Sequence, residues 1–189
     1  MNRILGTAFQ QAYVVRDLEP LMRRFIDTFN VGPFIHIQGS PPLDFFYRGQ
    51  RTAPKFTVAY TYIGEVQVEI IQPLNDAPSP YRDFLASRSK GGIQHMGFWP
   101  DDVPAAHRHL EAQGLKRCFE IKMASGDVVY YDPPDGMGTM IEIAAKGPAR
   151  AQLYAELHRL ANTWDGRDPI RRYTTMGDFA KASGITPMW

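Results

Sequence analysis

The sequence predicts an α+β fold of two similar units, each made of a strand and an amphipathic helix followed by further strands. The first observation is a repeat, in which a short apolar strand carries one polar residue and runs into an Asp that opens a helix. Gln10 in QQAYVVRDLE and His95 in HMGFWPDD hold this position, each seven residues before the Asp. The second observation is that each unit ends in a strand whose carboxylate lies among aliphatic residues, Glu69 in VQVEIIQP and Glu142 in MIEIAA.

The helix of the first unit is expected over residues 18–29, where apolar residues recur at the i, i+3, i+4, i+7 spacing of one helical face. Asp17 can accept hydrogen bonds from the N–H groups of its first turn, and residues 30–32 (Asn-Val-Gly) tolerate a left-handed exit. The second unit repeats the pattern, with residues 101–102 (Asp-Asp) as the cap and Gly114 as the stop. Both helices therefore have signals at each end.

The strands that follow the helices are indicated by alternating and β-branched residues, over 56–63, 65–72, 115–122, 127–132 and 139–145. The two polar positions are separated by 59 positions in the first unit (Gln10 to Glu69) and by 47 in the second (His95 to Glu142). The surplus falls in residues 38–55, whose Pro, Gly and aromatic residues predict a functional loop rather than a strand.

These segments divide the chain into one domain over residues 1–145 and a C-terminal part. The domain contains module one (6–75), a linker (76–92) with a short helix near its middle, and module two (93–145). Residues 146–189 do not repeat the pattern, and a helix followed by an irregular tail is expected there.

Composition narrows the classes of function. Hydrophobic residues make up 44% and charged residues 22%, as in globular proteins, and the formal charge is +1, so neither nucleic acid nor an anionic membrane is an expected partner. Cys118 is the one cysteine, and neither a signal peptide nor a membrane-spanning apolar run is visible. We therefore expect a cytoplasmic protein.

Strand parity tests whether the four polar positions belong together, because side chains alternate between the two faces of a strand. Beside Gln10, Glu69, His95 and Glu142, the opposite face is bulky and apolar in every strand, while their own face carries mostly small or polar neighbours. The apolar face is suited to packing on the helices, and the polar face is expected to line a cavity. A buried carboxylate is costly unless it is paired or metal-bound, so two of them beside a His and a Gln predict a divalent metal site.

The segments QQAYVVRDLEPLMRRFIDTFNVGPF, VQVEIIQPL, GGIQHMGFWPDDVPAAHRHLEAQG and MIEIAA resemble the vicinal oxygen chelate superfamily, which includes glyoxalase I, methylmalonyl-CoA epimerase, bleomycin resistance proteins and extradiol dioxygenases. The resemblance covers about residues 6–145. It implies two paired βαβββ modules that form a curved, open mixed sheet around a metal site, with the C-terminal helical extension outside it. It also implies a homodimer.

The family's ligand positions fall on Gln10, Glu69, His95 and Glu142. This set resembles that of eukaryotic-type glyoxalase I, whereas QPL and SPYRDFLASRSKGGIQHMGF look more like the epimerase branch. The Thr and Asn that hold glutathione in glyoxalases have no counterpart in EIIQPLND, and neither Asp44 nor Glu65 aligns cleanly with the additional acidic base of epimerases.

Oxygen-rich ligands with one imidazole suit Zn, Ni, Co, Mn or Mg. The expected activity is that of a glyoxalase-like lyase or isomerase, in which the cation stabilises the enolate of a small or aromatic carbonyl substrate. Glu142 or Glu69 would be the catalytic base, and Glu142 is preferred.

Two alternative functions remain open from the sequence, and so does the role of a set of aromatic residues. The fold also supports non-enzymatic, drug-sequestering binding proteins, although relatives of that kind lack metal ligands. Extradiol cleavage calls for two His and one carboxylate, and one His stands at a ligand position here. An aromatic set near the predicted strands could stack on a substrate or simply fill the core or a dimer interface: Phe45, Phe46, Tyr47, Tyr60, Tyr62, Trp99, Tyr130 and Tyr131.

Overall fold

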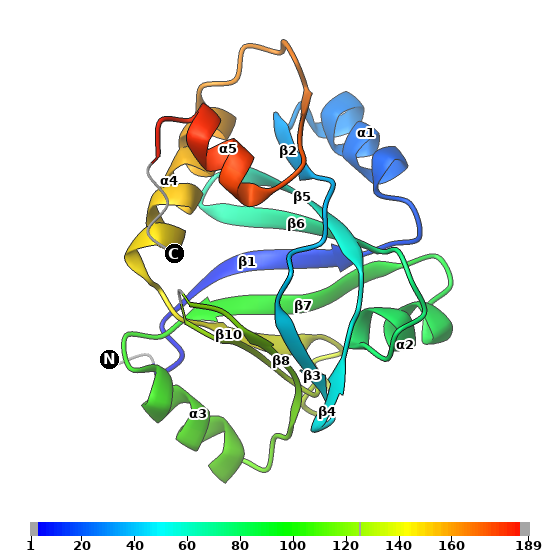
Figure 1. Cartoon of the computed structure of the whole chain (residues 1–189), viewed down its shortest axis with the longest axis vertical. Helices are drawn as coiled ribbons and strands as arrows, with labels where there is room; N and C mark the ends of the chain where they lie inside the picture. Colours follow the sequence, from blue (N-terminus) through cyan, green and yellow to red (C-terminus); the bar gives the residue numbers. More distant parts are fainter. Residues whose placement is uncertain (1–3, 125, 186–189) are drawn as a thin grey trace.

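A computed structural model describes residues 4–124 and 126–185 and contains one mixed sheet of 11 strands with five helices in those residues (Figure 1). The strands are β1 (Thr7–Val14), β2 (Phe34–Ile37), β3 (Asp44–Tyr47), β4 (Gln50–Thr52), β5 (Phe56–Ile63), β6 (Val66–Pro73), β7 (Gly92–Trp99), β8 (Arg117–Lys122), β9 (Val128–Tyr131), β10 (Met140–Ala144) and β11 (Ile170–Tyr173). The helices are α1 (Leu18–Phe29), α2 (Pro80–Ser87), α3 (Val103–Ala112), α4 (Pro148–Asn162) and α5 (Met176–Ala182). The predicted α+β class is confirmed.

The two units meet at the centre of the sheet, where β1 pairs antiparallel with β7. Within the first unit β1 pairs in parallel with β6, and within the second unit β7 pairs in parallel with β10. The complete order is β11-β2-β5-β6-β1-β7-β10-β9-β8-β3-β4. The last strand of each unit therefore lies beside its first strand, and the strands that carry the repeat occupy the middle of the sheet.

Both helices of the repeat begin and end where the sequence indicates. Asp17 accepts a hydrogen bond from the backbone N–H of Glu19, and Asn30 ends α1 in the left-handed conformation with φ 54°. Asp102 accepts from the N–H of Ala105 at the start of α3, and Gly114 follows that helix with φ +84°. Local capping therefore sets where both helices begin and end.

The apolar faces of β6 and β10 pack on these helices, as parity predicts. Met22 and Phe25 of α1 share a buried cluster with Val68 and Ile70 of β6. Leu110 of α3 shares another with Ile141 and Ile143 of β10. The opposite face of the sheet is thereby left for the polar positions.

Short connections show how strongly the sheet curves. β2 and β3 are eight steps apart in strand order, about 38 Å in a flat sheet at roughly 4.8 Å per step. Residues 38–43 connect them and can span at most about 25 Å. Residues 53–55 join β4 to β5, also eight steps away, and can span at most about 14 Å. The two ends of the sheet must therefore approach each other, and in Figure 1 the chain from β2 to β3 crosses in front of β6, β1 and β7.

The prediction of a loop over residues 38–55 is wrong in part. β3 and β4 form a hairpin, and β3 pairs with the edge strand β8 of the second unit. The strand β2 was also not predicted, because its four residues FIHI are too few to show a period. The surplus residues of the first unit therefore bridge the two ends of the curved sheet.

The inside of the curve is filled by aromatic and aliphatic side chains, which we call the interior cluster. It draws on both units, on the hairpin, on α2 and on α4, and includes Phe45, Tyr47, Phe56, Tyr60, Tyr81, Phe119, Tyr130, Leu153 and Leu157. In Figure 1, α4 lies beside the left-hand ends of β5 and β6, and α2 lies near the right-hand end of β7. The two helices thus contribute to the interior from opposite ends of the strands.

The region expected to be an irregular tail contains further regular structure. β11 pairs in parallel with β2, and α5 opens with a capping box between Thr175 and Asp178. The strand β11 (IRRY) has no alternating apolar pattern that could have predicted it. As an edge strand it is held mainly by backbone hydrogen bonds, which leave no such pattern in the sequence. The capping box is visible in the sequence and could have predicted α5. Residues 186–189 of the expected tail lie outside the described residues.

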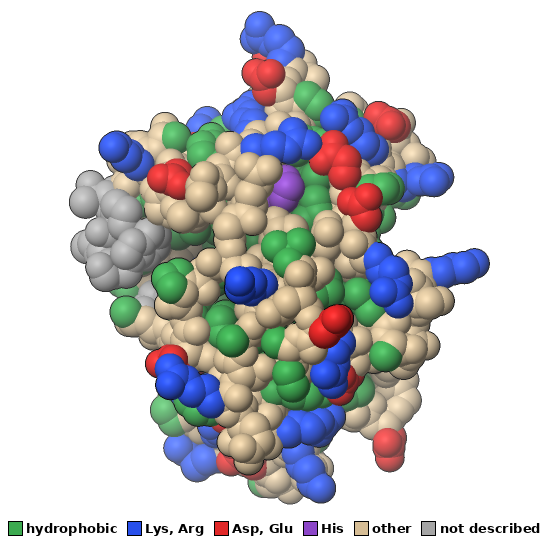
Figure 2. Space-filling model, turned by 45° about the vertical axis from the view of Figure 1, so that its right-hand side comes forward, with side chains coloured by type: hydrophobic (Ala, Val, Ile, Leu, Met, Phe, Trp, Pro, Cys, Tyr) green, Lys and Arg blue, Asp and Glu red, His purple; other side chains and the backbone are tan. Residues whose placement is uncertain are grey.

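Lys and Arg side chains are interspersed with Asp and Glu on the face shown in Figure 2, consistent with the formal charge of +1. Within the described residues, no helix has the length and apolar character needed to cross a bilayer.

Candidate metal centre

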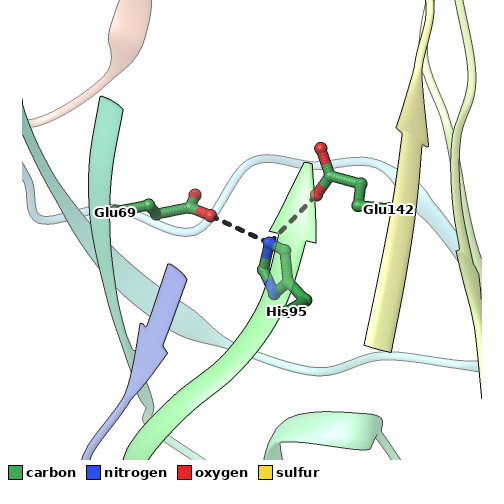
Figure 3. Close-up of side chains that lie close together, drawn as sticks. All are labelled: Glu69, His95 and Glu142. Carbon is green, nitrogen blue, oxygen red and sulfur yellow. Dashed lines mark ion pairs between the residues drawn. The ribbon is translucent and has the colours of Figure 1, made fainter. Parts of the chain in front are cut away.

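Four adjacent strands at the centre of the sheet each supply one side chain to a common point on its inner face. In strand order these are Glu69 on β6, Gln10 on β1, His95 on β7 and Glu142 on β10. Figure 3 shows the two carboxylates approaching the imidazole from opposite sides. The structure therefore brings together all four positions that the repeat singled out.

The point of convergence is Nε2 of His95. It lies 3.2 Å from Oε1 of Gln10, 3.2 Å from Oε2 of Glu142 and 3.5 Å from Oε2 of Glu69. Neighbouring ligands of a tetrahedral or octahedral cation with bonds of about 2.0–2.2 Å are separated by about 2.9–3.6 Å. The separations from Nε2 fall in that interval, and the donor atoms of Glu69, His95 and Glu142 all lie within 4.8 Å of one another. This donor set fits a divalent cation.

A β-bulge on β7 places a partner behind the imidazole. The register between β1 and β7 shifts between Ala12 and Tyr13, and Gln94 lies at the shift beside His95. Oε1 of Gln94 is 2.6 Å from Nδ1 of His95. Because an amide oxygen can only accept, Nδ1 carries a proton and Nε2 is the nitrogen turned toward the three oxygens.

A second buried glutamine orients Gln10. Nε2 of Gln10 donates to Oε1 of Gln67 at 2.8 Å, which leaves Oε1 of Gln10 facing His95. Nε2 of Gln67 in turn donates to the hydroxyl of Tyr62 at 3.1 Å. The side chain of Gln10 also needs the space left by Gly97, where a methyl group would come within 3.0 Å of it. Gln10 and His95 are therefore each oriented by the side-chain amide of a buried glutamine.

The imidazole and the two carboxylates stabilise one another's charged forms. Burial alone would lower the pKa of His95, but the hydrogen bonds and charges of Glu142 and Glu69 outweigh it and raise the pKa to about 9. Burial opposes ionisation of Glu142, yet the hydrogen bond and charge of His95 lower its pKa. A single imidazolium thus holds two buried carboxylates together, a role that a divalent cation would fill more completely.

All four side chains are buried, and the cavity expected beside them stays a prediction. The exposed fractions are 4% for Gln10, 7% for Glu69, 0% for His95 and 5% for Glu142. Parity places Phe9, the neighbour of Gln10 in the sequence, on the opposite, outer face. This prediction is wrong, because Phe9 lies at a second register shift, between Ala8 and Gln10, and stacks on Trp99 in the interior cluster with ring centroids 4.4 Å apart. A bulge turns a residue to the other face, and single-sequence parity cannot detect it.

The aromatic set divides between the two faces. Tyr60, Tyr130 and Trp99 lie with the interior cluster, whereas Tyr131 packs beneath α3 on the outer face. The ring of Tyr130 meets the imidazole of His95 edge-on, with centroids 4.7 Å apart.

The two acidic residues considered as an additional base, Asp44 and Glu65, have exposed side chains, unlike the buried residues of the site. Asp44 pairs with Arg51 at the surface, and the side chain of Glu65 is 90% exposed beside His158. Gln67 and Gln94 were missed as site residues. Gln67 shares the face of Glu69 and could have been found by parity, but the position of Gln94 depends on the bulge.

Replacing Gln94 by Met is expected to weaken metal binding by about 10–100-fold, because the imidazole loses the acceptor that fixes its tautomer and orientation. The side chain keeps nearly its length, so we expect the protein to remain folded. The dissociation constant of Co²⁺, followed by its visible absorption, measures the effect. Gln50→Met on the exposed strand β4 is the control, and equal affinities in the two variants would contradict the role of Gln94.

Comparisons with known proteins agree with this architecture. Residues 9–131 match the model of the Glyoxalase/Bleomycin resistance protein/Dioxygenase superfamily. No curated protein matches the chain significantly.

Solved structures of similar fold include methylmalonyl-CoA epimerase from Mycobacterium tuberculosis, with a TM-score of 0.56 and 19% identity over 80% of this chain and 96% of that one. A second methylmalonyl-CoA epimerase has a TM-score of 0.51 and 21% identity over 77% of this chain and 98% of its own. The Streptomyces coelicolor enzyme, in complex with 2-nitronate-propionyl-CoA, has a TM-score of 0.51 and 14% identity over 74% of this chain and 94% of its own. At these identities the likeness shows the fold alone. With the family match extending over residues 9–131, the chain belongs to the glyoxalase/bleomycin resistance protein/dioxygenase superfamily.

Proposed function

We propose that the protein is a metal-dependent lyase or isomerase of the glyoxalase or epimerase type, acting on a small or aromatic carbonyl substrate. The observation that carries the proposal is the convergence of three oxygens from Gln10, Glu69 and Glu142 on Nε2 of His95. Each comes from a different strand, so the arrangement is a property of the whole sheet.

Zn, Ni, Co, Mn or Mg would each suit this donor set. When bound, the cation would polarise the substrate carbonyl and stabilise the negative charge that develops as the adjacent C–H loses its proton. The residues of the chain would hold the cation, exclude water and move the proton. Burial of all four side chains favours these roles, because charge interactions are stronger in a site closed to water.

Glu142 is the proposed base. Although burial opposes it, the combined influence of His95, the hydroxyl of Tyr130 and the guanidinium of Arg150 lowers the pKa of Glu142, so that its carboxylate is ionised and able to accept a proton. Glu69, on the other side of the imidazole, is the alternative (Figure 3). Proton abstraction next to a carbonyl is the step that lyases and isomerases of this type share.

The test is deuterium exchange at the carbon next to the carbonyl, in D2O and with metal-loaded protein. CoA thioesters, hemithioacetals and aromatic hydroxyketones form the panel of substrates. We expect exchange with one class, and a loss of about 10²–10⁴-fold in Glu142→Gln that exceeds the loss in Glu69→Gln at equal metal content. Absence of exchange across the panel, with metal bound, would favour a binding protein on the same fold.

A further inference from the structure

The C-terminal part of the chain adds structure to the side of the sheet that holds the site. The family match ends at residue 131, whereas α4 covers Pro148–Asn162. The three solved relatives are matched over 94–98% of their own length but cover 74–80% of this chain. The helix α4 therefore lies outside the part of the chain that matches the family.

One face of α4 is packed into the interior. Leu153 and Leu157 are buried in the interior cluster, and the helix contacts β5. Tyr60 of β5 belongs to the same cluster and lies next to Glu69 on β6 in the pairing of the two strands. The helix thus covers the inner face of the sheet beside one of the two carboxylates.

Tyr154 is the residue of α4 whose ring packs on neighbours of the site. Its ring stacks on Trp99 with centroids 5.5 Å apart and an interplanar angle of 12°, and lies 5.9 Å from the ring of Phe9 and 6.4 Å from that of Tyr60. Burial raises its pKa most, and the negative charges of Glu69 and Glu142 raise it further, although Arg150 opposes them. Phe9 is next to Gln10 on β1, and Tyr60 pairs with Glu69 across β5 and β6, so the ring of Tyr154 packs on the immediate neighbours of two site residues.

Tyr154 is more exposed to solvent than Tyr81, the tyrosine that packs at the other end of the strands. Tyr81 of α2 is 1% exposed and hydrogen-bonds with Tyr130 at 3.3 Å. Tyr154 is half-buried, and its ring packs on those of Trp99 and Phe9. Of these two tyrosines, Tyr154 is the one whose side chain solvent reaches.

The helix is held at both ends. Near its start Arg150 donates hydrogen bonds to the carbonyl oxygens of Ala145 and Gly126. Near its other end His158 is 3.1 Å from Glu65, in the turn between β5 and β6, and its ring meets that of Tyr62 edge-on. Because the backbone is anchored, access to the site would depend on the side chain of Tyr154 rather than on displacement of the whole helix.

We propose that α4 caps the metal centre and that Tyr154 is a specificity-determining residue, restricting the site to ligands small enough to pass its ring. The inference rests on the metal site of the proposed function. It favours small carbonyl compounds over CoA esters as substrates, because the chain's own helix and the ring stack of Phe9, Trp99 and Tyr154 pack in the interior beside the site.

The test is the rate at which chelators remove Co²⁺ from the loaded full-length protein. Acetohydroxamate is the small chelator and EDTA the bulky one. We expect Tyr154→Ala to speed removal by EDTA at least about tenfold and removal by acetohydroxamate much less, because the ring no longer limits passage. Tyr154→Phe keeps the ring and is expected to stay within about twofold of the wild type for both chelators.

Tyr173→Ala is the matched control, since Tyr173 is another partly buried tyrosine of the C-terminal part and packs on Phe179. A rate unchanged by Tyr154→Ala, or an equal acceleration by Tyr173→Ala, overturns the cap. Metal content is measured first. If the wild type binds no metal, both the metal centre and the cap are wrong. If it binds metal and Tyr154→Ala releases that metal at the wild-type rate, the cap alone is wrong.

Discussion

Replacing His95 by Ala is expected to lower the affinity for a divalent cation by more than about 100-fold, since loss of an outer partner alone costs about 10–100-fold. His95 supplies the nitrogen around which the three oxygens converge. Its loss also leaves Glu69 and Glu142 buried with no imidazolium between them. In the metal-free protein we therefore expect the free energy of unfolding to fall by about 3–5 kcal/mol. Calorimetric titration with Co²⁺ and urea unfolding measure the two effects.

The matched control for this variant is His36→Ala. His36 is also a buried histidine, but it lies on β2 and bonds with the hydroxyl of Thr57 at 2.7 Å. It is expected to retain the metal affinity of the wild type. If the two variants bind the cation equally well, His95 is not a ligand. Circular dichroism tests whether His95→Ala is folded. A folded variant with reduced affinity has lost a ligand rather than its structure.

Replacing Phe119 by Ala is expected to lower the free energy of unfolding by about 3–5 kcal/mol, a large share of the roughly 5–15 kcal/mol available to a typical domain. Phe119 on β8 is fully buried in the interior cluster. Its ring stacks on Phe45 of the hairpin at 5.9 Å and meets Tyr81 of α2 and Tyr130 of β9 at 5.6 Å each. It therefore joins the hairpin, α2 and the second unit.

Urea unfolding monitored by tryptophan fluorescence measures this loss. Phe29→Ala, at the end of α1, is the control because its side chain is 61% exposed, and a change within about 0.5 kcal/mol is expected there. A loss of less than about 1 kcal/mol for Phe119→Ala would mean that the ring does not pack as described.

The parts of the fold that local chemistry decides could be predicted from the sequence. The bounds of α1 follow from an apolar face with a cap at Asp17 and a left-handed exit at Asn30, and both lie where expected. The convergence of Gln10, Glu69, His95 and Glu142 could be predicted for a similar reason. Each lies in a recognisable strand, and the repeat places them at equivalent positions in two units that pair through β1 and β7.

The parts that depend on long-range pairing could not be predicted. The hairpin of β3 and β4 is stabilised by an edge strand more than sixty residues away, and a local pattern contains no information about that partner. The bulges that turn Phe9 and Gln94 toward the interior change the face on which a residue lies without changing its sequence signal. The cap by α4 follows from the curvature of the sheet, so the closed site could be seen only in three dimensions.

The most direct test of the metal centre is a crystal structure of the Co²⁺-loaded protein with anomalous scattering recorded at the cobalt absorption edge. We expect one anomalous peak per chain, at about 2.0–2.2 Å from Nε2 of His95 and from oxygens of Gln10, Glu69 and Glu142. A fully loaded crystal with no peak among these four side chains, or with its cobalt at another site, would contradict the metal centre.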